Sequence, residues 1–253
     1  MIEISKHIQF VETADLDGVK TFIIGLPEIG LVGTISAIQI IKSLKMKEVG
    51  YIKSDLFPPI VIFHDATPKA PFRFFRKDEL ALLVAEIPLP PTALNVFVED
   101  LVEWIKARKV ELTILIGAVP LPNRAQVSYE DLTVFGIPIG NYAEEIATPL
   151  NMPTFKDGII AGPLAKILWR LMEEQVPTLS LYATAFEHYP DPGAAIATLN
   201  VLSKIIGTEI DVQELIEKAD EIRLRLRDLA HSTDRTMVEM GKSAEHSLPA
   251  LYA

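Results

Sequence analysis

The sequence contains no cysteine, which excludes disulfide bonds and thiolate chemistry and favours a cytoplasmic setting. It has no run of about 18 uncharged apolar residues, so we expect no membrane-spanning helix. The start, Met1-Ile2-Glu3, lacks the basic and apolar segments of a signal peptide. Basic residues are scarce, with 24 Lys and Arg against 34 Asp and Glu and a net charge of −10. We therefore expect no nucleic-acid or membrane partner, whereas a protein partner with a basic surface, or one of mixed charge, is compatible with this net charge.

Catalytic motifs are also missing. The five histidines form no i,i+4 pair and no H-E-x-x-H metal motif, and no G-x-S-x-G elbow occurs. His188 follows an expected strand, where a catalytic residue is possible, but a packed or surface role is the alternative. Adjacent acidic residues are common and are typical of solvated helix and turn charges. We therefore expect no catalytic residue, no metal site, no cofactor and no enzyme activity, although sites assembled from distant residues leave no motif.

What the chain does contain is apolar patterning, with 49% hydrophobic residues in 253. Apolar β-branched runs alternate with amphipathic stretches, which predicts one α/β domain over residues 1–231. The polar, poorly patterned residues 232–253 are expected to form a flexible C-terminal tail. Strands are expected over 2–11, 21–25, 49–55, 60–65, 72–75, 80–87, 112–117, 132–138 and 179–185, and helices over 34–45, 93–108, 163–174, 192–206 and 211–229.

Three glycines, Gly25, Gly30 and Gly33, lie between an expected strand and helix, an arrangement that invites a phosphate-binding interpretation. The spacing fits neither the dinucleotide fingerprint nor the Walker loop, and Glu28 places a negative charge in the turn. The alternative is that the glycines permit a tight turn and close helix–strand packing. Arg124, in the loop after the strand at 112–117, is the best single candidate for an anion ligand. Its alternative is a surface arginine or one paired with a carboxylate.

Aromatic residues interleave with arginine over Phe72-Arg73-Phe74-Phe75-Arg76. Such a pattern occurs in single-stranded nucleic-acid binders, but two arginines in an acidic chain make a poor electrostatic groove. We therefore expect a half-buried strand or an exposed contact patch here.

The last three residues, Leu251, Tyr252 and Ala253, combine an apolar side chain, a tyrosine ring and a carboxylate. Capture of a C-terminal carboxylate is a known recognition mode, and tyrosine buries a large ring at low entropy cost. The eighteen residues from Thr236 to Ala253 would span about 60 Å when stretched and average about 20–25 Å as a flexible coil. The sequence therefore favours a docking role for this end.

Several segments in order resemble the proteasome assembly chaperone family, closest to its archaeal homologues. They are Thr21–Gly33, Pro120–Arg124, Asp157–Pro163 and the stretch from Asp191-Pro192-Gly193-Ala194-Ala195 to Ile206–Asp211, and the resemblance spans Met1 to Arg227. It implies an α/β sandwich similar to purine nucleoside phosphorylase, with a mixed sheet flanked by helices and without catalysis. It also implies a homo-oligomer, for which we expect a tetramer.

The resemblance gives the chain end a meaning. Proteasome activators dock between α subunits of the core particle through a C-terminal motif of a hydrophobic residue, a tyrosine and any residue. Leu251, Tyr252 and Ala253 match this motif position by position. The leading hypothesis is thus a proteasome assembly chaperone or ATP-independent activator. The rivals are a nucleoside or phosphate-compound enzyme or sensor near Gly25–Gly33 and Arg124, and a scaffold whose partner is a paralogous chaperone.

Overall fold

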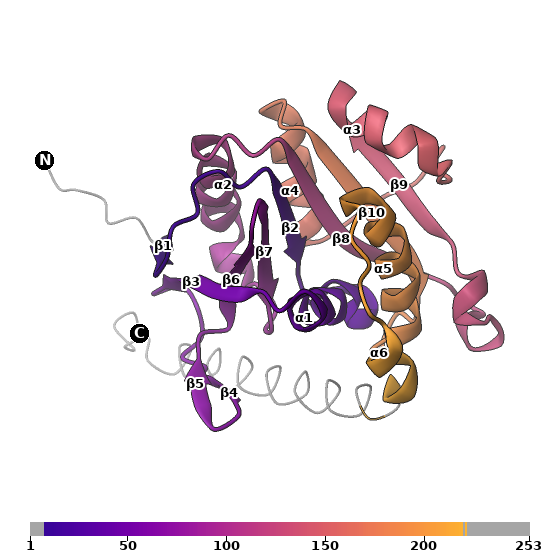
Figure 1. The fold of residues 1–253 in the computed structure, drawn as a ribbon, viewed down its shortest axis with the longest axis horizontal. Coiled ribbons are helices and arrows are strands. Elements are labelled where there is room, and N and C mark those ends of the chain that lie inside the picture. The colour runs from indigo at the N-terminus through magenta and orange to yellow at the C-terminus, as the bar shows by residue number, and fades with distance from the viewer. Residues whose placement is uncertain (1–7, 220, 222–253) are drawn as a thin grey trace, which may run out of the picture.

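An eight-stranded mixed sheet with helices on both faces makes up most of the described part of the chain (Figure 1). The computed structural model describes residues 8–219 and 221. The strand order is β1-β3-β6-β7-β2-β8-β10-β9, and β4 with β5 forms a separate two-stranded hairpin. This architecture confirms the mixed α/β fold predicted from the sequence.

The elements have the following bounds. The strands are β1 (Ile8–Glu12), β2 (Thr21–Gly25), β3 (Lys47–Ser54), β4 (Ile62–His64), β5 (Thr67–Lys69), β6 (Phe72–Lys77), β7 (Leu80–Ala85), β8 (Leu112–Pro120), β9 (Val134–Ile139) and β10 (Thr178–Ala185). The helices are α1 (Val32–Leu44), α2 (Pro91–Ala107), α3 (Asn141–Ala147), α4 (Pro163–Glu173), α5 (Pro192–Ile206) and α6 (Gln213–Glu217).

The centre of the sheet consists of the parallel strands β7, β2, β8 and β10. Helices α2 and α4 cover one face, and α1 and α5 cover the other, so two hydrophobic cores flank the sheet. Because both faces are covered, a central strand is apolar along its whole length. In β8 every residue from Leu112 to Ala118 is buried, as the continuous apolar run at 112–117 predicts.

The start of α2 differs from the expected helix at 93–108. The helix begins at Pro91, with Pro90 in the N-cap position. Proline suits the first helical position, because its fixed φ is helical and its missing N–H has no partner there. The apolar face expected for this helix is buried, including Phe97, Val98 and Leu101.

The hairpin stands out from the lower left of the body in Figure 1. One strand is expected from the sequence over 60–65, but the structure has two short strands, β4 and β5. The turn between them contains Asp65 and Ala66 with φ of 47° and 58°. Two successive residues with left-handed φ are typical of the two-residue hairpin turn whose twist matches that of the strands. Such turns usually contain glycine, and this one does not, so the sequence did not indicate a hairpin here.

Some predictions fall partly or wholly outside the described residues. The strand expected over 2–11 is seen as β1 from Ile8 onward, and the helix expected over 211–229 is seen as α6 up to Glu217. The tail 232–253, with Leu251, Tyr252 and Ala253, lies outside the described residues, so the division into body and tail stays a prediction. Among the described helices, none has the length and apolar character needed to cross a membrane.

Candidate functional site

The turn between β2 and α1 carries the glycines considered for phosphate binding. Gly25 closes β2, Gly30 adopts a left-handed conformation with φ of 62°, and Gly33 lies in the first turn of α1. A Cβ atom on Gly33 would lie 2.5 Å from the carbonyl oxygen of Leu26 and 2.8 Å from that of Ile116. The helix therefore meets the sheet at a separation that only glycine allows. This is the close helix–strand packing that was the alternative to a phosphate site.

Arg124 follows β8, as expected, but its side chain is buried and its guanidinium donates hydrogen bonds within the chain. Its Nε and Nη2 atoms donate to the two carboxylate oxygens of Asp191 at 2.7 and 2.9 Å, and Nη1 donates to the carbonyl of Val127 at 2.7 Å. Asp191 also accepts the N–H groups of Phe186 and Ala194, the second of which caps the start of α5. Arg124 is thus an arginine paired with a carboxylate, and the pair joins the end of β8 to α5.

Glu28, in the same turn as the glycines, reaches the start of α4. Its Oε1 accepts the N–H of Leu164 at 3.1 Å, which places a carboxylate at the positive end of the helix. It lies so close to Gly162 that a Cβ there would be 2.6 Å from Oε1. Burial raises the pKa of Glu28 to about 7, and the hydrogen bond from Leu164 offsets only part of the rise. The amide end of α4 is therefore occupied by a carboxyl group of the chain itself.

Tyr182 of β10 lies near this carboxyl group. Its ring passes over Gly117 of β8, where a Cβ would be 2.6 Å from a ring carbon. The hydroxyl is buried and has no hydrogen-bond partner within the part of the chain that the structure describes. Burial, with a smaller contribution from the charge of Glu28, raises the pKa of Tyr182. Burial thus favours the neutral phenol form of Tyr182.

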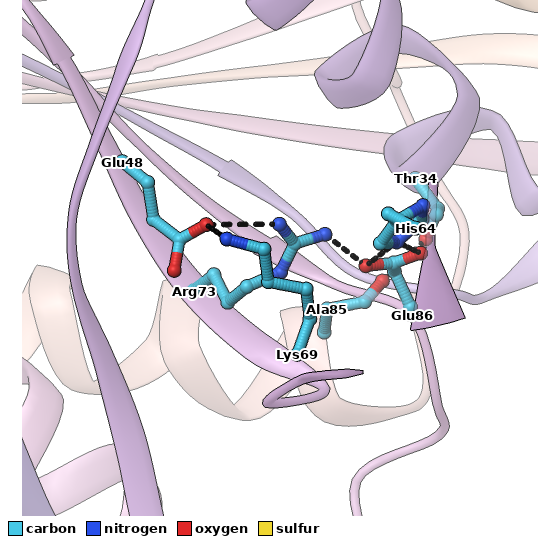
Figure 2. Close-up of polar contacts among 7 residues, drawn as sticks. All are labelled: Thr34, Glu48, His64, Lys69, Arg73, Ala85 and Glu86. Carbon is cyan, nitrogen blue, oxygen red and sulfur yellow. Dashed lines mark hydrogen bonds and ion pairs between the residues drawn. The ribbon is translucent and has the colours of Figure 1, made fainter. Parts of the chain in front are cut away.

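An ion network with a buried centre lies where β7 ends beside the hairpin (Figure 2). Glu86 directly follows β7, and its side chain is only 4% exposed. It forms an ion pair with the buried Arg73 of β6, and its two carboxylate oxygens lie 3.0 and 2.8 Å from Nε2 of His64 at the end of β4. Such a carboxylate is tolerated because partners compensate for its lost hydration.

The same network reaches the second strand of the hairpin. Nη1 of Arg73 lies 3.4 Å from Oε2 of Glu48 on β3, and Nζ of Lys69 on β5 donates to that oxygen at 2.7 Å. Both hairpin strands are thus fastened to the body, β4 through His64 and β5 through Lys69. Thr34 of α1 donates to the carbonyl of Ala85 at 2.8 Å and so fixes the end of β7 that precedes Glu86.

The outer side of the hairpin is apolar. Val61 and Phe63 are 58% and 64% exposed, whereas Ile62 between them is buried. A groove of about 500 Å³ lies between the hairpin and β3. Its apolar lining includes Tyr51, Phe57, Pro58, Ile60, Val61 and Pro68. The ion network therefore holds an exposed apolar surface in a fixed position.

Two further predictions from the sequence concern a metal site and His188. No three His, Asp or Glu side chains within residues 8–219 and 221 gather closely enough to hold a metal ion. His188 is exposed and lies 3.7 Å from the adjacent Glu187, which is the surface role given as its alternative. The ion network at the hairpin was not predicted. The only sign of it in the sequence was one charged residue in each of two apolar runs, Arg73 in 72–75 and Glu86 in 80–87.

Comparison with known proteins identifies the family of the chain. The sequence model of the PAC2 family matches residues 22–230. An uncharacterized protein of Methanocaldococcus jannaschii is 26% identical over 237 residues, which cover 93% of this chain and 96% of that protein. The match to the family confirms the resemblance noted in the sequence.

Two solved structures extend the comparison. Pyrococcus furiosus PbaA, an archaeal homologue of proteasome-assembly chaperone, is 28% identical and has a TM-score of 0.78, with 91% of this chain and 99% of that chain covered. Pyrococcus furiosus PbaB, an archaeal proteasome activator, is 23% identical and has a TM-score of 0.73, with 88% and 99% covered. The similarity to PbaB shows the fold alone. The similarity to PbaA extends to the amino-acid sequence as well as the fold.

Proposed function

The chain belongs to the PAC2 family, and on that premise we propose that it binds the proteasome core particle as an assembly chaperone or an ATP-independent activator. The observation that carries the proposal is this membership, together with the similarity to PbaA, an archaeal homologue of proteasome-assembly chaperone. The fold shared with PbaB, an archaeal proteasome activator, supports the activator form of the proposal.

We propose that binding occurs through Leu251, Tyr252 and Ala253, which dock between α subunits of the core particle. A short terminal motif binds weakly alone. Several copies in one homo-oligomer, for which we propose a tetramer, raise the effective concentration and strengthen binding about 10²–10⁴-fold where the geometry permits. The body would then serve to gather and present the tails, without catalysis of its own.

The rival function, a small-ligand enzyme or sensor, has less support. Arg124 donates to Asp191 and Val127, and Glu28 lies at the start of α4. The Arg124 guanidinium and the backbone N–H of Leu164 in α4, which could otherwise donate to a phosphate, thus already have partners within the chain. A paralogous chaperone as second partner is compatible with the leading proposal and does not compete with it.

Co-sedimentation tests the proposal and separates its two forms. The full chain is mixed with assembled core particles and, separately, with isolated α subunits. An activator is expected to sediment with core particles and to raise their peptide hydrolysis without ATP, whereas an assembly chaperone is expected to bind isolated α subunits. Absence of the chain from both complexes at micromolar concentration would reject the proposal.

A further inference from the structure

The hairpin surface, which we define as Val61, Phe63, Asp65 and Pro68 together with Tyr51 and Lys53 of β3, has features that the proposed function does not use. Side chains alternate along an extended chain, so Val61, just before β4, and Phe63 within it lie on one side, while His64 points inward to Glu86. Phe63 lies opposite Pro68 in the hairpin ladder, and Pro68 also lines the groove. The exposed phenylalanine and the groove therefore belong to one continuous apolar face.

The charges on this surface are of two signs and lie at its two ends. Asp65 is exposed in the hairpin turn, and Lys53 is exposed on β3 where it lines the groove. Neither forms an ion pair within the described part of the chain, in contrast to Lys69 and Glu48 beside them. The hairpin turn thus carries a negative charge, Asp65, and the groove carries a positive charge, Lys53, and neither has an ion-pair partner within the described residues.

The hairpin is held in place before any partner arrives. His64 and Lys69 fasten its two strands to Glu86 and Glu48 (Figure 2). A surface that is already ordered loses less conformational entropy on binding than a mobile one. A projecting aromatic side chain in such a surface is typical of the residues that dominate interface energies.

We propose that the hairpin surface docks onto the same surface of a second copy of this chain. In a two-fold contact each copy supplies the same patch, so a self-complementary patch must hold both the projecting and the receiving parts. This patch does so, since Phe63 projects beside an apolar groove and Asp65 and Lys53 have opposite charges. Phe63 of each copy enters the groove of the other, and Asp65 of each copy faces Lys53 of the other. The inference rests on the homo-oligomer of the proposed function, for which it names a contact, and self-association is measured without the proteasome.

Sedimentation velocity of the full chain over a concentration series tests the contact. We expect Phe63→Asp to weaken self-association at least tenfold and to halve the mass at concentrations where the wild-type chain is associated. The matched control is Met172→Asp, because Met172 is an apolar side chain 40% exposed on α4, and it should leave the mass unchanged. Circular dichroism checks that each variant is folded.

Charge reversal tests the pairing itself. Lys53→Glu and Asp65→Lys should each weaken the association, and the double variant should restore it to within a few-fold of wild type. Lysine is accepted in the left-handed conformation of Asp65, since Lys45 and Lys109 adopt it with φ of 52° and 53°. A wild-type chain that sediments as a single copy, a Phe63→Asp variant with wild-type mass, or a double variant that stays dissociated would each overturn the inference. Deleting residues 251–253 should leave self-association intact, which separates this result from that of the proteasome experiment.

Discussion

A carboxylate oxygen of Glu86 lies 2.8 Å from Nε2 of His64, and this contact joins the hairpin to the end of β7. On its other side Glu86 pairs with Arg73, which is buried in β6. The contact is therefore one end of a chain of charges that crosses from the hairpin through the body to β3. Its energetic role can be tested by removing the central carboxylate.

We expect Glu86→Ala to lower the free energy of unfolding by about 3–5 kcal/mol, because Arg73 would stay buried without its main counter-charge. Arg73→Met combined with Glu86→Leu should recover most of this loss, since apolar side chains of similar volume can replace a buried ion pair. Urea unfolding followed by circular dichroism measures both. The control is Glu79→Ala, which removes a pair exposed to solvent and should not move the midpoint. An unchanged midpoint for Glu86→Ala would contradict the anchoring role.

The pair of Arg124 and Asp191 leads to a second prediction. Arg124→Ala should destabilise the fold by about 3 kcal/mol, because Asp191 would be buried without its cation. Arg124→Lys should lie between that variant and wild type, since an ammonium group cannot reproduce the two parallel hydrogen bonds of the guanidinium. Lys204→Ala, at an exposed position, serves as the control and should leave the unfolding midpoint in place.

The same arginine separates the leading hypothesis from its small-ligand rival. With its donors held by Asp191 and Val127, Arg124 is not expected to bind an added anion. Thermal unfolding should therefore show no shift with inorganic phosphate or with a purine nucleoside. Stabilisation by either compound that disappears in Arg124→Lys would favour the rival instead.

Glu28 leads to a pH-dependent prediction. Its pKa is raised from 4.5 to about 7 by burial, so the folded protein favours the protonated form. The resulting stability, up to about 3 kcal/mol for such a shift, is fully present below pH 4.5 and is lost as pH rises through 7. Glu28→Gln keeps a hydrogen-bond acceptor for Leu164 but cannot ionise. We expect this variant to be more stable than wild type at pH 8 and similar to it at pH 5.

Urea unfolding at several values between pH 5 and pH 8 measures this difference. Glu111→Gln removes an exposed acidic group and is the matched control, whose stability difference from wild type should not vary over the same interval. A Glu28→Gln variant that loses stability relative to wild type as pH rises would show that the ionised carboxylate is the form favoured by the fold. The interpretation of the Glu28 site would then be wrong.

The sequence predicted the parts of the fold that depend on local periodicity. The apolar run at 112–117 indicated a strand buried on both faces, and the spacing of Phe97, Val98 and Leu101 indicated the buried face of α2. Both depend only on residues near each other in the chain. The strand order and the hairpin depend on contacts between distant segments, which periodicity does not record.

The candidate site shows the same division. Arg73 was noted within an aromatic run, but its partner Glu86 follows the next strand and its partner Glu48 precedes it on β3. The antiparallel pairing of β6 with β7 brings Arg73 opposite Val84, two residues before Glu86. Only this register turns two isolated charges in apolar runs into a buried pair. The carboxylate partner of Arg124, sixty-seven residues away, was hidden for the same reason.

The most direct test of the central proposal is the affinity of the full chain for the proteasome core particle, measured by surface plasmon resonance with and without Tyr252→Ala. We expect Tyr252→Ala to lose at least about 2 kcal/mol, roughly thirtyfold, because an aromatic anchor dominates such a contact. Tyr189→Ala, at a tyrosine that is 57% exposed on the body, should bind as wild type does. Equal affinity of wild type and Tyr252→Ala, or no binding by either, would contradict the account.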